Sequence, residues 1–149
     1  MDQIKVNNFR KEYPNRDFPA YRCLDSLEII ELRKSLVAKV DGLEATCSDL
    51  DIVRAVDQAQ SLVRDFCIGE FFEFESFLED QNLIAEGTDK IWLNWYRYDD
   101  VDELDRKDFS KYFKDLWYEG ADDLDIIDPQ LAWIVSVGHS GIIKVLRLG

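Results

Sequence analysis

The chain has 149 residues, 46% of them hydrophobic and 13% aromatic, which excludes a disordered polypeptide and suits a single folded domain. It carries 31 acidic against 18 basic residues, a formal net charge of −13. A field of this sign repels nucleic acid and anionic membrane and attracts basic proteins, although acidity also serves solubility alone. We therefore expect a soluble protein that contacts neither nucleic acid nor membrane directly.

The apolar runs and the cysteines predict the cellular compartment of the protein. No apolar run approaches the roughly 20 residues of a membrane span, and residues 1–8 contain no signal-peptide core. Cys23, Cys47 and Cys67 are an odd number at wide spacing, which favours reduced thiols over a disulfide framework. These features predict a cytoplasmic protein.

The first half of the chain is predicted to be an irregular arm followed by helices. Residues 1–24 lack a clear period and are interrupted by two prolines, so they predict an irregular arm with room for one short strand. An apolar stripe predicts a helix over 27–40, capped by Asp25 or Ser26. A second helix is predicted to begin at Ser48, and its apolar repeat continues to about residue 67.

The middle of the chain holds one ambiguous segment and one clear strand. Residues 70–81 fit both a helix and a strand, and the helix is favoured because the segment ends in good helix formers. Residues 90–98 are rich in β-formers and predict a strand with Ile91 and Leu93 on one face and Trp92 on the other. A helix with an apolar stripe over 109–116 follows, capped by Asp102 or Asp105.

The C-terminal segment predicts an antiparallel meander. Strands are expected over 123–128, 131–138 and 142–148, with a glycine-containing hairpin turn at 139–141. We expect the strand at 90–98 to join them. The prediction is thus one α+β domain over residues 1–149, in which N-terminal helices pack on a C-terminal, mainly antiparallel sheet of about four strands, with 1–24 as an irregular N-terminal arm.

Motifs for catalysis and cofactor binding are missing from the sequence. His139 is the only histidine, which excludes a multi-histidine metal site, and beside Ser140 in a tight turn it is a poor nucleophile–base pair. Neither a phosphate-binding loop nor a dinucleotide fingerprint is present. We therefore expect no catalytic residue, no cofactor and no metal.

The most acidic stretch is 99–128, which holds twelve acidic and four basic residues. Its aspartates suggest, in this order, a partner-facing surface, a solvated strand face, a hard-cation site and acid/base catalysis. These residues can form one partner-facing surface only if the loops around 99–103 and 118–125 lie on the same side of the fold. The predicted partner-binding residues are Asp99, Asp100, Asp102, Glu103, Tyr118, Glu119, Asp122, Asp123, Asp125 and Asp128.

One resemblance bears on function. The run 116–128, the strand containing Trp133 and the Gly-His-Ser-Gly turn at 138–141 resemble the C-terminal part of small bacterial immunity-type proteins, over about a fifth of the chain. Such proteins accompany polymorphic or contact-dependent toxins. The resemblance implies a cytoplasmic inhibitor that binds its toxin and blocks the active site, and it assigns no role to any single residue.

The leading hypothesis is a non-enzymatic acidic binding protein, an immunity-type inhibitor that neutralises a basic toxin such as a nuclease domain. A second hypothesis is a DNA-mimic inhibitor of a nucleic-acid-binding protein, which uses the same acidity. A third is a small metal-dependent enzyme that uses the aspartate cluster.

Overall fold

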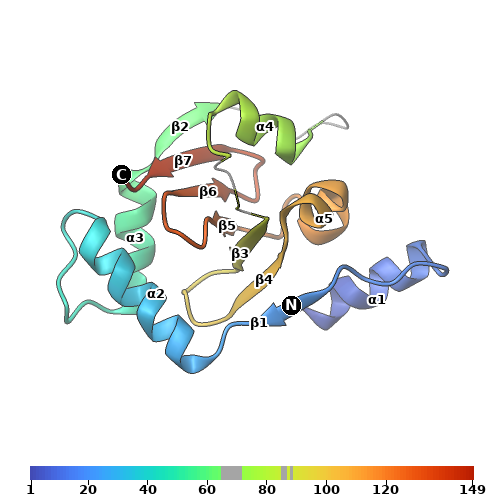
Figure 1. Cartoon of the computed structure of the whole chain (residues 1–149), viewed down its shortest axis with the longest axis horizontal. Coiled ribbons are helices and arrows are strands. Elements are labelled where there is room, and N and C mark those ends of the chain that lie inside the picture. Colours follow the sequence, from blue (N-terminus) through green and yellow to red (C-terminus); the bar gives the residue numbers. More distant parts are fainter. Residues whose placement is uncertain (65–71, 85–86, 88) are drawn as a thin grey trace.

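A computed structural model describes residues 1–64, 72–84, 87 and 89–149, and its strands form a single antiparallel sheet (Figure 1). The strand order is β1-β4-β3-β5-β6-β7-β2, and every neighbouring pair is antiparallel. The elements in chain order are α1 (Gln3–Glu12), β1 (Tyr21–Cys23), α2 (Ser26–Lys39), α3 (Asp49–Ala59), β2 (Ser61–Arg64), α4 (Phe74–Asp80), β3 (Lys90–Asn94), β4 (Val101–Asp105), α5 (Arg106–Lys111), α6 (Phe113–Leu116), β5 (Leu124–Ile127), β6 (Trp133–Val137) and β7 (Ile143–Arg147). The predicted α+β class is confirmed.

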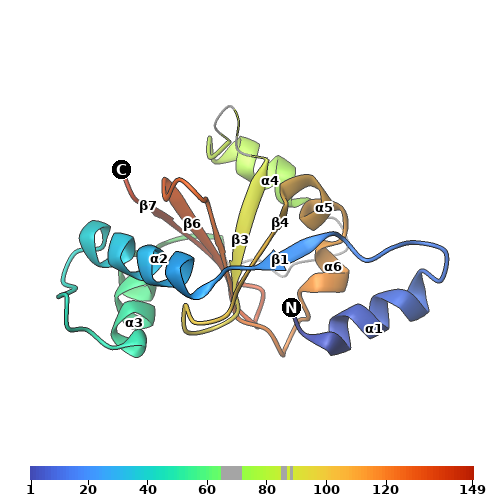
Figure 2. The same ribbon diagram turned by 60° about the horizontal axis from the view of Figure 1, so that its bottom comes forward.

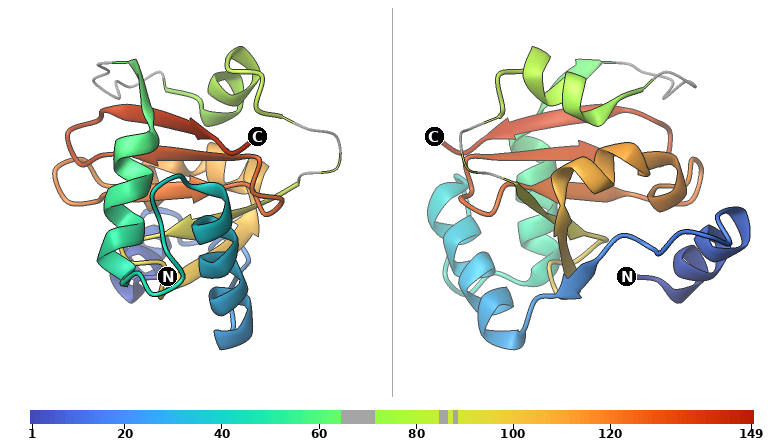
Figure 3. Two further views of the ribbon diagram at one scale, coloured as in Figure 1. Left: turned by 90° about the vertical axis from the view of Figure 1, so that its left-hand side faces the viewer. Right: turned by 45° about the vertical axis from the view of Figure 1, so that its right-hand side comes forward.

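The sheet separates two hydrophobic cores, because helices cover both of its faces (Figure 2). α1, α4, α5 and α6 lie on one side, and α2 and α3 lie on the other; Figure 3 shows each helix group in front of the strands. In β3, Ile91 and Leu93 belong to the first core and Trp92 packs against the second, which confirms the predicted alternation of that strand.

Local capping explains where the helices of the second layer begin. The Asp25 carboxylate accepts hydrogen bonds from the backbone N–H of Leu27 and Glu28 at 2.8 and 2.9 Å, and the Glu28 carboxylate accepts one from the Asp25 N–H at 2.8 Å. Ser48 and Asp51 form the same reciprocal box at the start of α3. Both predicted caps are confirmed. α4 confirms the helix predicted within 70–81 for the described residues, while 70–71 lie outside them.

The prediction of an irregular arm over 1–24 is wrong in its first half, which is helical. Asp2 caps α1 by accepting a hydrogen bond from the Ile4 N–H at 2.8 Å, and Val6 and Phe9 are buried one helical turn apart. α1 ends before Pro14, where the backbone can no longer continue a helix. The single short strand for which the prediction left room is β1, at the sheet edge beside β4.

Two predicted elements are too long. The helix from Ser48 ends at Ala59, because the chain pairs as β2 with β7, and tertiary pairing overrides the helical pattern. The remainder of that pattern, including Cys67, lies outside the described residues. β3 ends at Asn94 rather than residue 98, because the Asn94 side chain accepts a hydrogen bond from the Tyr98 N–H at 2.7 Å and Tyr98 has a φ of 57°.

The acid-rich run after residue 99 contains a strand that the sequence did not predict. β4 pairs with β3 and β1, and Asp105 at its end caps α5 by accepting hydrogen bonds from Lys107 and Asp108 N–H at 2.9 and 3.2 Å. The cap at Asp105 is therefore confirmed, and the helix expected over 109–116 is divided at Tyr112 into α5 and α6. With β1, β2 and β4, the described residues form a sheet of seven strands rather than about four.

Strand register brings the acidic loops together. Asn94 at the end of β3 pairs with Asp125 near the start of β5, so loops 95–100 and 117–123 leave the sheet at the same end. The 138–142 turn joins them there, since Gly120 N–H donates to His139 O at 2.7 Å. The condition placed on the predicted acidic surface is met. In the described part of the chain, no helix has the length and apolar character of a membrane span.

Candidate functional site

Two of the predicted partner-binding carboxylates, Asp102 and Asp128, are buried and serve the fold. Asp102 in β4 lies 2.7 Å from the Met1 ammonium and accepts a hydrogen bond from Trp95 Nε1 at 2.9 Å. Asp128 accepts one from the Ala132 N–H at 3.0 Å and holds the turn before β6. Their prediction as exposed partner contacts is therefore wrong, because alternation on strands and turn capping turn them inward.

The same region gathers three groups that can ligate a metal. Donor atoms of Cys23, Asp100 and Asp102 lie within 4.8 Å of one another. Cys23 Sγ donates to Asp102 Oδ1 at 3.2 Å, and this hydrogen bond, together with burial, raises the pKa of the thiol. Cys23 and Asp102 are thus bound to each other, and Asp102 is also paired with the Met1 ammonium.

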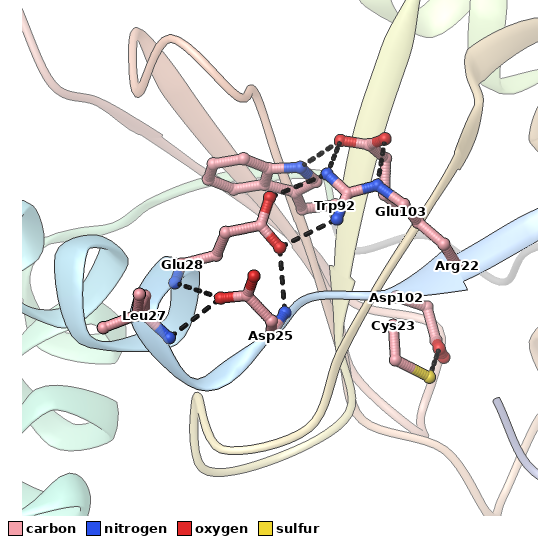
Figure 4. A network of polar contacts seen from close by, with 8 residues as sticks. All are labelled: Arg22, Cys23, Asp25, Leu27, Glu28, Trp92, Asp102 and Glu103. Atoms are coloured by element: carbon pink, nitrogen blue, oxygen red, sulfur yellow. Dashed lines mark hydrogen bonds and ion pairs between the residues drawn. The ribbon is translucent and has the colours of Figure 1, made fainter.

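Glu103 and Asp122 are charge-paired within the protein. Glu103 accepts hydrogen bonds from Arg22 Nε and from Trp92 Nε1, both at 2.9 Å, in a network that reaches α2 (Figure 4). Asp122 pairs with the buried Lys5 of α1 and accepts from the Tyr118 N–H at 2.7 Å. Each of these carboxylates is neutralised by a cation of the protein itself.

Tyr118 is covered rather than presented to solvent. The Lys5 ammonium lies over its ring, 4.0 Å from the centroid, and over the Trp95 ring at 4.9 Å. Lys5 therefore binds α1 to both loops at this end of the sheet. Tyr118 is half-buried, so only part of its side chain remains available for the partner contact that the sequence predicted.

Four predicted residues remain exposed and lie in the loops at one end of the sheet; we call them the acidic loop surface: Asp99, Asp100, Glu119 and Asp123. Asp123 accepts a hydrogen bond from the His139 N–H at 2.8 Å and lies 2.9 Å from His139 Nδ1. Beside them Tyr96 is 56% exposed, in the loop after β3 rather than in the strand predicted over 90–98. An exposed tyrosine next to exposed carboxylates is a typical composition of a protein-binding surface.

A groove of about 330 Å³ opens beside this surface, between α3 and the strand ends. Residues of α3, of the ends of β5 and β6 and of the turn before β7 line it. Its apolar lining residues are Val53, Val56, Leu124, Val137 and Ile142, of which Leu124 and Val137 belong to the core on the other face of the sheet, and its polar lining residues include Asp57, Tyr96, Asp123, Asp125, His139 and Lys144. Its volume is at the lower end of the range of about 300–1,000 Å³ for ligand sites.

Asp125 lies at the floor of the groove and is held by neutral donors. It accepts hydrogen bonds from Asn94 Nδ2 at 3.0 Å, from Tyr98 Oη at 2.7 Å and from Ser136 Oγ, which itself accepts from Gln60. Desolvation raises the pKa of Asp125 although these hydrogen bonds oppose the change. A desolvated carboxyl group in a cleft is a candidate functional group.

The four aspartates of the 122–128 segment do not converge on one point. Asp122 binds Lys5, Asp123 binds His139, Asp125 lies in the groove and Asp128 caps a turn. Among the residues that the structure describes, no convergent group of three potential metal ligands comes from this segment. Sequence reasoning missed Asn94, Tyr98 and Ser136, and the signal for Ser136 was its position on the same strand face as the buried Ile134.

Comparison with known proteins gives no guide to function, so function is inferred from the geometry of the site. No protein-family model, curated protein or solved structure matches this chain.

Proposed function

We propose that this protein is a non-enzymatic inhibitor of the immunity type, which binds a basic toxin, such as a nuclease domain, in the cytoplasm. The observation that supports the proposal is the acidic loop surface, where four exposed carboxylates and the exposed ring of Tyr96 lie at one end of the sheet. The net charge of −13 extends the attraction beyond this surface and accelerates encounter with a basic protein.

The mechanism is charge pairing around an aromatic anchor. The carboxylates of the acidic loop surface pair with Lys and Arg residues of the partner, and Tyr96 packs against its surface. Close charge pairs at such interfaces couple by roughly 1.5–7 kcal/mol in the best measured case. If the bound cations are those with which the partner holds its own anionic substrate, binding also blocks its activity.

The test compares three baits of the full chain in the native host, with captured proteins identified by mass spectrometry. The first is the unaltered protein. The second carries Asp99→Asn, Asp100→Asn, Glu119→Gln and Asp123→Asn, which neutralises the acidic loop surface. The third is a control with the same loss of charge at exposed positions: Asp41→Asn, Glu44→Gln, Glu79→Gln and Asp80→Asn.

The control positions lie near the opposite end of the sheet. Lys39 Nζ contacts Leu148 O at 3.5 Å and Arg147 contacts Gln81 O at 2.7 Å, so the α2 and α4 ends lie beside the end of β7. We expect a basic protein on the first and third baits, eluted by salt and missing from the second. Retention of the same protein by the second bait would contradict the proposal. Capture of a host nucleic-acid-binding protein in place of a toxin would replace the immunity role with DNA mimicry.

A further inference from the structure

The carboxylate of Asp125 is half-buried, and among the residues that the structure describes no cation contacts it. Its three hydrogen-bond donors, from Asn94, Tyr98 and Ser136, are neutral. The charged groups that face the groove from its walls are Asp57 on α3, Lys144 on β7 and Asp123 at the rim. Lys144 is already paired with Asp57 at 2.5 Å, and His139 lies against Asp123 at 2.9 Å.

A half-buried carboxylate held by neutral donors favours a cation supplied from outside. Withdrawing a carboxylate from water costs free energy that neutral donors offset only in part, and an opposite charge at the same place offsets much more. An ionised carboxyl group offers about four acceptor positions, and the hydrogen bonds of Asp125 use three. Within the described part of the chain, one position is therefore open to a further donor.

The walls of the groove suit the rest of such a ligand. Val53 and Val56 of α3 line it with apolar surface, and the exposed Tyr96 lies beside them among the lining residues. Lysine and arginine have an apolar stem and a charged head, so they bury the stem against apolar walls and place the head at a carboxylate. A guanidinium or ammonium group is the chemistry that matches both features of the groove.

We propose that the groove takes one lysine or arginine side chain of the basic partner, with its stem against Val53 and Val56 of α3 and its cationic head at Asp125. The inference rests on the proposed function, because the groove and the acidic loop surface share Asp123 and adjoin at Tyr96. Asp125 is then the specificity-determining contact inside the interface, and the exposed carboxylates attract the partner around it.

Small blocked amino acids test the groove without the partner. Nα-acetyl-arginine amide and Nα-acetyl-lysine amide are titrated into the ¹⁵N-labelled full chain, beside Nα-acetyl-citrulline amide, which has nearly the shape of the arginine probe and no charge. We expect saturable shifts of amide signals at Val56, Asp125 and Ser136 with the two cations, and at least tenfold weaker binding of the citrulline probe. Equal binding of citrulline, or shifts confined to the exposed loops, overturns the inference.

Variants assign the effect to the groove. Asp125→Asn removes the charge and keeps the shape, and it abolishes the shifts; Asp80→Asn, at an exposed carboxylate near the other end, leaves them unchanged. Val53→Phe fills the groove while the Asp125 hydrogen bonds remain, so it also abolishes the shifts, even if Asp125→Asn does not fold. Binding by a folded Val53→Phe variant would overturn the inference.

The captured basic protein separates this inference from the proposed function. We expect Asp125→Asn to weaken its binding at least tenfold and the cationic probes to compete with it. If the acidic loop surface is needed for capture but Asp125→Asn binds as the unaltered chain does, only the groove inference fails. If cations bind in the groove while capture is independent of the acidic loop surface, the proposed function fails, and with it the assignment of the groove to a partner side chain.

Discussion

Tyr98 Oη donates a hydrogen bond of 2.7 Å to Asp125 Oδ2, which fastens the loop after β3 to the neighbouring strand β5. Asn94 completes the arrangement, since its amide donates to the same carboxylate oxygen at 3.0 Å while its oxygen accepts from the Tyr98 N–H. These hydrogen bonds hold Tyr98 in its left-handed backbone conformation. The floor of the groove is therefore formed before any ligand enters.

Replacing Asp125 is expected to change how stability depends on pH. Burial raises the pKa of this carboxyl group in the folded protein above the unfolded value of about 3.9. Between these two pKa values the native state binds more protons than the unfolded state, so the contribution of Asp125 to stability falls as pH rises through that window.

Asp125→Asn removes this contribution. The difference in free energy of unfolding, variant minus wild type, therefore becomes more positive from pH 4 to pH 7. Urea denaturation at intervals across that range measures it, with Asp80→Asn as the control at an exposed aspartate. A difference that stays flat with pH would show that Asp125 is solvated.

Asn94 is expected to be sensitive to both size and charge. Asn94→Ala leaves the buried Tyr98 N–H without its acceptor and should lower the free energy of unfolding by about 2–3 kcal/mol. Asn94→Asp retains that acceptor but sets a second carboxylate beside Asp125. Its destabilisation should be larger at pH 7 than at pH 4, as measured by urea denaturation at both values. Equal losses at the two pH values would contradict the proximity of the charges.

Lys5 is expected to stabilise the protein through Asp122. Lys5→Met keeps an apolar stem but removes the ammonium from the carboxylate and from the Tyr118 ring, and we expect a loss of about 2 kcal/mol. In a double-mutant cycle with Asp122→Asn the two losses should be less than additive, as thermal unfolding will show. Lys34→Met, whose ion pair with Glu31 is exposed, is the matched control and should have no measurable effect. Additive losses would mean that the two side chains act independently.

The N-terminal cap of α2 gives a local prediction. Asp25→Ala removes the acceptor of the Leu27 and Glu28 N–H groups and should cost about 1 kcal/mol, whereas Asp25→Ser supplies another cap and should restore most of it. Chemical denaturation of the two variants measures the free energy of unfolding of each. Equal stability of the alanine and serine variants would show that the capping box contributes nothing.

Local signals were enough to predict much of the fold. The meander of β5, β6 and β7 follows from alternation and from the turn at Gly141, whose φ is 81°. The starts of α2 and α3 follow from capping boxes, which act within four residues. These features depend on neighbours in sequence, so the sequence alone shows them.

Elements that depend on distant partners were missed. β4 is acidic and short, and it is a strand because β1 and β3 flank it. β2 has a helical pattern but completes the edge at β7. For the same reason the candidate site was predicted only in part: acidic loops are visible in sequence, whereas the burial of Asp102 and the groove around Asp125 depend on which strands become neighbours.

The placement of β1 and β2 at the two edges of the sheet has a consequence for biosynthesis. Ser61 pairs with Val145 and Cys23 with Asp102, so neither early strand has a partner until much later residues have left the ribosome. The central strands β3, β5, β6 and β7 lie closer together in sequence and lose less chain entropy on pairing. β1 and β2 are therefore synthesised well before the strands with which they pair, and we expect the sheet to form from its middle outward.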